Sequence, residues 1–594
     1  MDVVDTIVFV LILLLISIVG VFFGRRNSSK NTHNELLVGS NVSAFNIALS
    51  VCSSFLSAVS LLGFPSEVYF RGSSVLWFLA VYAISFPTVA YVFLPVFYNL
   101  KVSSIYEYLE KRFSFTCRLL ASLTFITQTI LYLAVALYAP ALALSQCLDL
   151  PMIISIVATA LISAIYLFIG GAKAGIHTSA LQMALIICSL LIVCVASMAS
   201  WDANMLWKNS EKGLRLDPND FQLNPQARHS VWAFLIGATF NLFSLFGTNQ
   251  LTLQRYMGRL FKELRFVNTL QSQMTNEISA MPTLKQAQKV VLLNIPMNSI
   301  MIFMYTFLGL VTYSIFHGCH PTDLETSDKI LPYFIANKLN WIVGLEGLFM
   351  ASVYSAGIST LTASYNALTA VVIEDVIKVT VSRFSKNHTV LNAQIHLRII
   401  QLLPFVFAFI AMLLAILVGS IKTMILQTCF SVFGALGGAV LSVFIVGLFF
   451  PYINSKYAAL AGQIAAILAC GYVSIGSLYY KVTPVNLPLV TQCLANSSNI
   501  SFEYSESFGM VTAQSSGGVW AAFSKISYHY YSVVGVLVGV IVANVVQLIL
   551  KLLNLAPRRK VNSTLLVHFL RVKPPNIVIE AAESQCLSKN CSEN

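Results

Sequence analysis

The stretch AFNIALSVCSSFLSAVSLLGFPSEVYFRG, residues 44–72, decides the fold. It is long and apolar enough to cross a bilayer, but serines recur through its middle, and Gly63 and Pro65 interrupt it further along. A helix broken at membrane depth exposes backbone carbonyls, which persist there only when they are buried in protein or line a wet cavity that can hold an ion. The stretch therefore predicts a broken membrane helix with an ion-binding role.

The composition is that of an integral membrane protein. Of the 594 residues, 57% are hydrophobic and only 10% are charged, and the mean hydropathy is +0.77. Average soluble domains are about 25% charged. The fold class predicted from these runs of apolar residues is an all-α integral membrane protein with about thirteen transmembrane helices. The predicted spans are residues 6–24, 44–71, 74–100, 119–147, 150–170, 179–199, 230–253, 290–316, 343–376, 399–419, 423–451, 457–479 and 529–550.

Charges in the loops predict the orientation. When the segment after the first span is placed inside, the cytoplasmic segments hold 26 of the 36 Lys and Arg, which agrees with the positive-inside rule. The amino terminus is then extracellular and the carboxyl terminus cytoplasmic, and topology rather than a nucleic-acid partner explains the net charge of +12. The sequons at Asn496 and Asn499 fall in an outside loop and are predicted glycosylation sites. Cys319 and Cys493, also in outside loops, are a candidate pair.

The chain is predicted to form one transmembrane domain, residues 1–553, followed by a flexible cytoplasmic tail, residues 554–594. We find no G-x-S-x-G elbow, Walker A loop or H-E-x-x-H pair in the sequence. The sequence therefore does not predict an enzyme.

Hydroxyl side chains recur at helical spacing along the ninth predicted span, at Ser352, Ser355, Ser359 and Thr362. Two interpretations fit this pattern. Small hydroxyl residues let membrane helices approach closely, and neutral oxygens are the ligands that a desolvated sodium ion requires in number. The spacing alone does not decide between helix packing and a cation site.

The chain resembles the sodium/solute symporter family, in the branch that holds the iodide, multivitamin and monocarboxylate symporters. The matching stretches run in family order over about residues 5–550. They are SFLSAVSLLGFPSEVYFRG (54–72), LPVFYNLKVSSIYEYLEKRF (94–113), LYAPALAL (137–144), GGAKAGIHTSALQ (170–182), NPQARHSVWAFLIG (224–237), FGTNQLTLQRY (246–256), YSAGISTLTASYNALTAVVIEDVIK (354–378) and FSVFGALGGAVLSVFIVGLFFP (430–451).

The resemblance implies a LeuT-like core of 5+5 inverted repeats at roughly residues 44–451, with flanking helices at 6–24, 457–479 and 529–550. It also implies a sodium site between the broken helix and the ninth span. The implied ligands are the carbonyls of Ser53, Leu56 and Ala356 and the hydroxyls of Ser359 and Thr360. The implied substrate-lining candidates beside that site are Ser57, Ser60, Phe243, Phe246, Ser431 and Phe433.

Three features depart from the family pattern. Ser179 stands where the family usually carries an Asp, which puts a second sodium ion and normal coupling in question. Ser60 stands where relatives often carry a larger polar residue, so the substrate need not match theirs. About twenty extra residues, near 258–281, interrupt a predicted cytoplasmic loop.

The resemblance implies a plasma-membrane symporter that uses Na⁺ as the coupling ion and imports a small organic anion by alternating access. A monocarboxylate or a vitamin-type carboxylate is the expected substrate, and the expected partners are that anion and the lipid bilayer. Two alternatives remain open. One is an iodide-like or multivitamin-like substrate. The other is an uncoupled ion path or a sensor built on the same fold.

Overall fold

The structure, a computed structural model, describes most of the chain. The described residues are 2–26, 44–256, 283–384, 393–419, 424–489 and 511–570, apart from positions 101, 103, 318, 322, 323, 325, 481, 482, 485, 513–518, 556, 558–560, 568 and 569.

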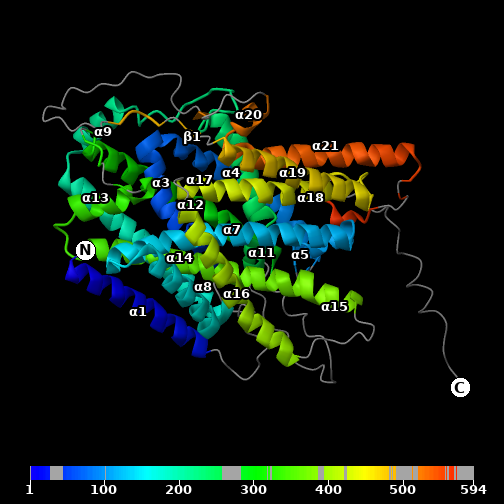
Figure 1. Ribbon diagram of the computed structural model, residues 1–594, viewed down its shortest axis with the longest axis horizontal. Helices are drawn as coiled ribbons and strands as arrows, with labels where there is room; N and C mark the ends of the chain where they lie inside the picture. Colours follow the sequence, from blue (N-terminus) through cyan, green and yellow to red (C-terminus); the bar gives the residue numbers. More distant parts are fainter. Residues whose placement is uncertain are drawn as a thin grey trace, which may run out of the picture.

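Long helices run alongside one another and make up the molecule (Figure 1). Among the described residues, ten helices are long and apolar enough to cross a membrane, and one bent pair adds an eleventh candidate. Two shorter apolar helices, Met152–Phe168 and Ala233–Gly247, coincide with the remaining predicted spans. The all-helical membrane fold is therefore confirmed, while the number of helices that cross the membrane stays a prediction.

The helices within residues 44–451 form the body of the bundle. They are α2 (Ala44–Phe55), α3 (Ala58–Arg71), α4 (Phe78–Thr88), α5 (Leu94–Leu100), α6 (Glu107–Arg112), α7 (Phe115–Leu148), α8 (Met152–Ser200), α9 (Ala203–Lys212), α10 (Thr239–Leu242), α11 (Gln250–Tyr256), α12 (Leu284–Ile315), α13 (Ile330–Lys338), α14 (Leu345–Val371), α15 (Lys378–Phe384), α16 (Ala393–Gly419), α17 (Ile425–Val432) and α18 (Gly438–Phe449).

Three long helices flank this body. On one side α1 (Val3–Arg26) packs against α8 and α14, and on the other α19 (Lys456–Tyr479) and α21 (Tyr531–Leu552) pack against each other and against α18 (Figure 1). Burial follows this arrangement, because 83% of the most apolar stretch of α14 is buried but only 22% of that of α1. The exposed Leu, Ile and Phe side chains of the outer helices suit a lipid environment.

Single turns of π-helix connect several of these α-helices. Turns of this kind occur frequently at functional sites. The π-helices are η3 (Val89–Phe93), η4 (Ala233–Ala238), η5 (Phe243–Gly247), η8 (Val372–Ile377) and η9 (Phe433–Gly437). The remaining short elements are the 3₁₀-helices η2 (Ser73–Trp77), η7 (Ser327–Lys329), η11 (Tyr528–Tyr530) and η12 (Ser563–Leu565), the helix α20 (Val519–Ser524), and the hairpin of β1 (Thr483–Pro484) and β2 (Val511–Thr512).

The structure differs from the predicted spans in two places. A loop is predicted near residues 172–178, but α8 continues through this segment, which contains glycines and no proline. The predicted span 230–253 is not one helix, because it breaks at Thr248 and Asn249 between η5 and α11. The Asn249 side chain accepts a hydrogen bond from the Leu251 amide and so caps the second piece.

Candidate functional site

The first stretch is broken as predicted, but the break lies at Leu56 and Ser57, and the expected interruption at Gly63 and Pro65 is wrong because both residues lie inside the continuous helix α3. The helices α2 and α3 meet at an angle of 63° across Leu56 and Ser57. The Ser57 side chain accepts a hydrogen bond from the Val59 amide and caps α3. The Ser60 amide bonds to the Ser57 carbonyl at 2.9 Å, whereas in an unbroken α-helix it would bond to the Leu56 carbonyl. The break thus takes the Leu56 carbonyl out of the helical hydrogen-bond pattern.

Hydroxyl groups from three separate helices converge beside this break. The Ser359 hydroxyl lies 3.0 Å from that of Ser53 and 2.8 Å from that of Ser179. The neighbouring Thr360 hydroxyl donates to the Ser54 carbonyl at 3.2 Å and to the Ala356 carbonyl at 3.1 Å. All of these residues are buried. The arrangement offers several neutral oxygens at one point, which is the chemistry that suits a desolvated sodium ion.

Ser179 is the residue that the sequence identifies as a missing carboxylate, and its hydroxyl belongs to this group of oxygens. No group of three or more His, Cys, Asp and Glu side chains that could hold a metal ion occurs in the part of the chain that the structure describes. The oxygens gathered around Ser359 therefore carry no formal charge.

Tyr132 of α7 is a residue of this site that sequence reasoning missed. Its hydroxyl lies near the side chains of both Ser57 and Thr360, so it stands between a predicted substrate residue and a predicted ion ligand. Its ring lies 4.7 Å from that of Phe433. Nothing in the local sequence distinguishes this tyrosine from the other aromatic residues of an apolar helix.

The substrate-lining candidates gather around the same break, with two exceptions. Ser60 donates to the Phe55 carbonyl, and the Phe55 ring lies 4.6 Å from that of Phe246. The π-helices η5 and η9, which begin at Phe243 and Phe433, contact each other. Phe243 itself packs on Phe93 at 5.9 Å, and Ser431 is half-buried on α17.

Two further hydroxyls of α14, those of Ser352 and Thr362, have packing contacts, whereas the buried Ser355 hydroxyl has no hydrogen-bond partner among the described residues. Ser352 donates to Ser189 of α8 and to its own helix, and Thr362 donates to the Ile358 carbonyl one turn earlier. Such contacts are typical of closely packed membrane helices. Both interpretations of the hydroxyl pattern thus find contacts in the structure, at different residues.

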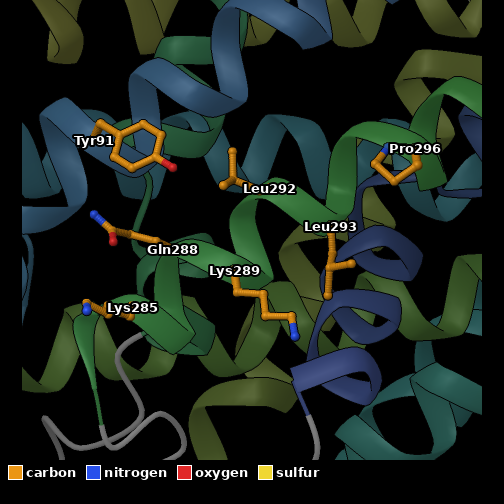
Figure 2. A pocket seen from close by; sticks show the side chains of 7 residues that line it. All are labelled: Tyr91, Lys285, Gln288, Lys289, Leu292, Leu293 and Pro296. Atoms are coloured by element: carbon orange, nitrogen blue, oxygen red, sulfur yellow. The ribbon is translucent and has the colours of Figure 1, made fainter.

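A groove lies elsewhere on the molecule, between η3 and the first half of α12 (Figure 2). Its volume is about 390 Å³, and it contains none of the residues predicted for transport. It is lined by Tyr91, Lys285, Gln288, Lys289, Leu292, Leu293 and Pro296.

A buried ion cluster surrounds Glu67 where α3 nears its end and α17 begins. Its residues are Glu67, Arg71, Arg228, His229 and Gln427, and we call it the α17 cluster. Glu67 Oε2 accepts from Arg71 at 2.6 Å, and Oε1 accepts from Arg228 at 2.9 Å and lies 3.0 Å from His229 Nε2. Arg228 Nη1 donates to Gln427 Oε1 at 2.7 Å.

A second buried cluster surrounds Asp375 of η8. Its residues are Ser104, Glu110, Arg118, Glu374 and Asp375, and we call it the α6 cluster. Asp375 accepts from Arg118 Nε at 2.6 Å and from the Ser104 hydroxyl at 2.5 Å. Arg118 also donates to the Glu110 carboxylate at 2.8 Å and to the Glu374 carbonyl at 3.1 Å.

The two predicted glycosylation sites, Asn496 and Asn499, lie outside the described residues, as do Cys493 and the extra loop near 258–281. Cys319, the other member of the candidate pair, is disulfide-bonded in the structure.

In this bundle a broken helix packs against a second helix, and neutral oxygens gather between them. This arrangement defines a secondary transporter that couples transport to an ion. The model of the sodium:solute symporter family matches residues 36–466. The chain belongs to that family, and sodium is its coupling ion.

The human sodium-coupled monocarboxylate transporter 2 is 34% identical to this chain over 554 residues, which cover 91% of the chain and 83% of that protein. The human sodium-coupled monocarboxylate transporter 1 is 32% identical over 563 residues, which cover 92% and 87%. The rabbit (Oryctolagus cuniculus) sodium-dependent multivitamin transporter is 30% identical over 491 residues, which cover 80% and 71%.

The solved structure of a Na⁺-coupled sialic acid symporter, in its substrate-bound outward-open state, has a TM-score of 0.69 with this chain. The two are 21% identical, and the match covers 92% of this chain and 98% of that one. The likeness confirms the fold, a LeuT-like core with additional flanking helices.

Proposed function

We propose that this chain is a plasma-membrane symporter that imports a small organic anion, a monocarboxylate or a vitamin-type carboxylate. The entry of sodium down its gradient drives this import. The observation that carries the sodium site is the group of neutral oxygens shared by Ser53, Ser179, Ser359 and Thr360 at the break between α2 and α3. The similarity to transporters of monocarboxylates and of multivitamins supports a carboxylate as the substrate. At a membrane potential of roughly −60 mV the potential alone contributes about 1.4 kcal/mol per charge.

Sodium and substrate are coupled through the break. The proposed ion ligands are the carbonyls of Ser53, Leu56 and Ala356 with the hydroxyls of Ser359 and Thr360. Tyr132 then lies between the two sites, because its hydroxyl is near Thr360 on the ion side and near Ser57 on the substrate side. An ion that ties the break to α14 orders the substrate pocket, so each ligand raises the affinity of the other by the same factor.

The proposed topology has the amino terminus outside and the carboxyl terminus in the cytoplasm, with residues 1–553 as the membrane domain and 554–594 as a tail. Two observations support it. Lys and Arg are concentrated in the segments that this orientation places inside. The disulfide of Cys319 suits a loop on the oxidising side of the membrane. The α17 cluster then faces outside and the α6 cluster faces the cytoplasm.

The test of the function is uptake and current in oocytes that express the full chain. Lactate, butyrate, nicotinate, biotin, pantothenate and iodide are each supplied in sodium and in choline medium. We expect sodium-dependent uptake of at least one carboxylate. Uptake that is indifferent to sodium would overturn the coupled function, and uptake of iodide alone would overturn the carboxylate assignment.

The test of the ion site is the double variant Ser359→Ala, Thr360→Ala. We expect its sodium requirement to rise sharply with surface expression retained, because two hydroxyl ligands are lost. Thr369→Ala is the matched control, since Thr369 is buried on the same helix but donates only to the Tyr365 carbonyl at 2.8 Å. An unchanged sodium requirement in the double variant would show that the ion binds elsewhere.

A second function has an observation in its favour. Ser179 brings no carboxylate to the ion site, and a weakly held ion favours an uncoupled ion path on the same fold. A current evoked by substrate without accumulation of that substrate would support this path over symport.

A further inference from the structure

We propose that Arg228 and Arg71 of the α17 cluster form a first binding site for the carboxylate of the transported anion, and that Gln427 occupies this site when α17 is closed over it. The inference rests on the proposed function and orientation, and it assigns the ligand of a cluster that lies outside the predicted substrate pocket.

The α17 cluster lies directly above that pocket on the same two helices. Along α3, Glu67 follows Ser60 by seven residues, which is about 10 Å of helix, and Gln427 precedes Phe433 by six residues, which is about 9 Å. One aromatic layer separates the two levels, because Phe430 contacts Phe64 at 6.4 Å. A solute that enters from this end passes the cluster before it reaches the pocket.

The helices α3 and α17 are closed against each other at this level. A side-chain carbon added at Gly63 would lie 2.7 Å from Leu426 Cβ. Glu67 and Arg228 are each about 1% exposed. The structure therefore shows the entrance shut at the cluster.

The hydrogen bonds inside the cluster leave its guanidinium groups short of anionic partners. Two guanidiniums share the single carboxylate of Glu67. Arg71 Nε is buried without a hydrogen-bond partner, and Arg228 Nη1 has the neutral oxygen of Gln427. The nearby Asp328 of η7 accepts from the Ile425 amide at 3.1 Å and so holds the first turn of α17. The unmet donor of Arg71 and the neutral partner of Arg228 Nη1 leave room for a carboxylate, which accepts in the plane of a guanidinium.

The groups that α17 contributes to its contacts with the cluster are neutral, and the ion pairs of the cluster do not involve α17. Glu67 and Arg71 belong to α3, and Arg228 belongs to the segment that leads into η4. From α17 and the residue before it, the cluster receives only the Gln427 amide oxygen and the Met424 sulfur. Displacement of α17 therefore breaks no ion pair. It exposes an assembled pair of guanidiniums, and the Gln427 oxygen leaves the position that a carboxylate oxygen then takes.

The experiment measures binding of radiolabelled butyrate, lactate and nicotinate to the purified full chain in detergent, in sodium and in choline buffer. We expect Arg228→Gln to weaken carboxylate binding at least tenfold, since a hydrogen bond to a charged group is worth about 1.5–3 kcal/mol. Arg228→Lys should restore part of the loss, because lysine keeps the charge without the planar fork. Gln427→Glu should weaken binding as strongly as Arg228→Gln, since its own carboxylate fills the site. Gln427→Ala should tighten binding two- to threefold.

Arg215→Lys is the matched control. Arg215 is as deeply buried as Arg228 and stacks on Tyr313 at 3.9 Å, but it donates to backbone carbonyls, including those of Tyr69 and Gly213. We expect the folded fraction of the Arg215→Lys variant to bind butyrate with the affinity of the wild type.

Two results would overturn the proposal: wild-type affinity in Arg228→Gln or in Gln427→Glu, or no binding of any of the three carboxylates to the wild type. Failure of the proposed function has a different outcome. In that case the wild type binds butyrate in an Arg228-dependent manner, but proteoliposomes show no uptake driven by a sodium gradient.

Discussion

The α6 cluster surrounds one guanidinium with acceptors, whereas the α17 cluster makes two guanidiniums share one carboxylate. Arg118 donates to Asp375, to Glu110 and to a backbone carbonyl. Arg71 and Arg228 both pair with Glu67. The clusters lie at opposite ends of the bundle. The continuous helix of α17, η9 and α18 has Gln427 near its start and Gly447 near its end, about 30 Å apart, and the Gly447 carbonyl accepts a hydrogen bond from Arg112 of α6. In Figure 1 the label of α17 lies toward the left and those of α5 and α15 toward the right.

The difference lies in which contacts hold each end closed. At the α6 end a charged hydrogen-bond network joins η8 to α6 and α7, and Ser104 and Gln250 extend it to the segment after α5 and to α11. At the α17 end no ion pair of the cluster reaches the closing helix, which contributes only the neutral Gln427 oxygen and Met424 sulfur. Breaking a buried ion pair costs about 3–5 kcal/mol, whereas a hydrogen bond between a charged and a neutral group is worth about 1.5–3 kcal/mol. We infer that the α6 cluster contributes mainly to stability, and that the α17 cluster is built to open.

The largest expected effect is in the α6 cluster. Arg118→Ala leaves the Asp375 carboxylate, which is fully buried, without its cation. Breaking a buried pair in this way costs about 3–5 kcal/mol. We expect the variant to lose most of its folded protein at the cell surface and to melt at a much lower temperature in detergent. The double variant Arg118→Met, Asp375→Leu should recover most of that stability, since the fully buried carboxylate is removed and Glu110, the other carboxylate that pairs with Arg118, is partly exposed. Equal stability of the single variant and the wild type would contradict a structural role for this cluster.

Asp328 lies at the α17 end of the bundle and is buried. Its carboxylate accepts a hydrogen bond from the Ile425 amide and, among the described residues, not from a guanidinium group. Burial raises the pKa of its carboxyl from 3.8 to about 7, against the hydrogen bond from Ile425, and the charges of Glu67 and Arg71 of α3 act on it in opposite directions. Between these two pKa values the folded protein holds the proton more tightly than the unfolded chain. The stability that Asp328 contributes therefore falls as the pH rises through this window, by up to about 1.4 kcal/mol per pH unit.

We expect Asp328→Asn to flatten the pH dependence of stability between pH 5.5 and 7.5. The measurement is the apparent melting temperature of the purified protein at both values, for the variant and the wild type. The same slope in both proteins would show that Asp328 does not titrate in this window.

The sequence predicts these features unequally. Serines within one apolar stretch indicate the broken helix, since Ser57 caps α3 at the break, whereas Gly63 and Pro65 lie inside α3 and do not interrupt it. The family resemblance supplies Ser359 and Thr360, and the structure brings both to the break. Arg118 and Asp375 are 257 positions apart, and no local pattern identifies their pairing. Tyr132 is equally hidden, since its role comes from contacts with two other helices.

The proposed ion site between the clusters has no fixed charge, and Ser179 allows this proposal to be tested. The Ser179 hydroxyl lies 2.8 Å from the Ser359 hydroxyl. In Ser179→Asp a carboxylate would therefore lie beside the Ser359 hydroxyl. We expect the sodium concentration for half-maximal activity to fall about tenfold, which corresponds to about 1.4 kcal/mol. Ser179→Ala should raise it instead. Sodium-dependent current measured over a range of concentrations checks both variants, and a shift in the same direction for both would contradict a ligand role at this position.

The smallest expected effect is that of Lys111→Ala on α6. This variant tests whether burial of the charges or their mere presence stabilises the α6 end. Lys111 and Glu107 form an ion pair one turn apart on α6, next to the buried cluster, at 2.9 Å, and their side chains are 42% and 23% exposed. Exposed pairs of this spacing contribute about 0.3–0.5 kcal/mol. We expect Lys111→Ala to shift the melting temperature in detergent by far less than Arg118→Ala, and added salt to reduce even that shift. A loss of stability comparable to that of Arg118→Ala would mean that the exposed and buried charges act as one network. The two ends would then differ in the number of their charges and not in the burial of those charges.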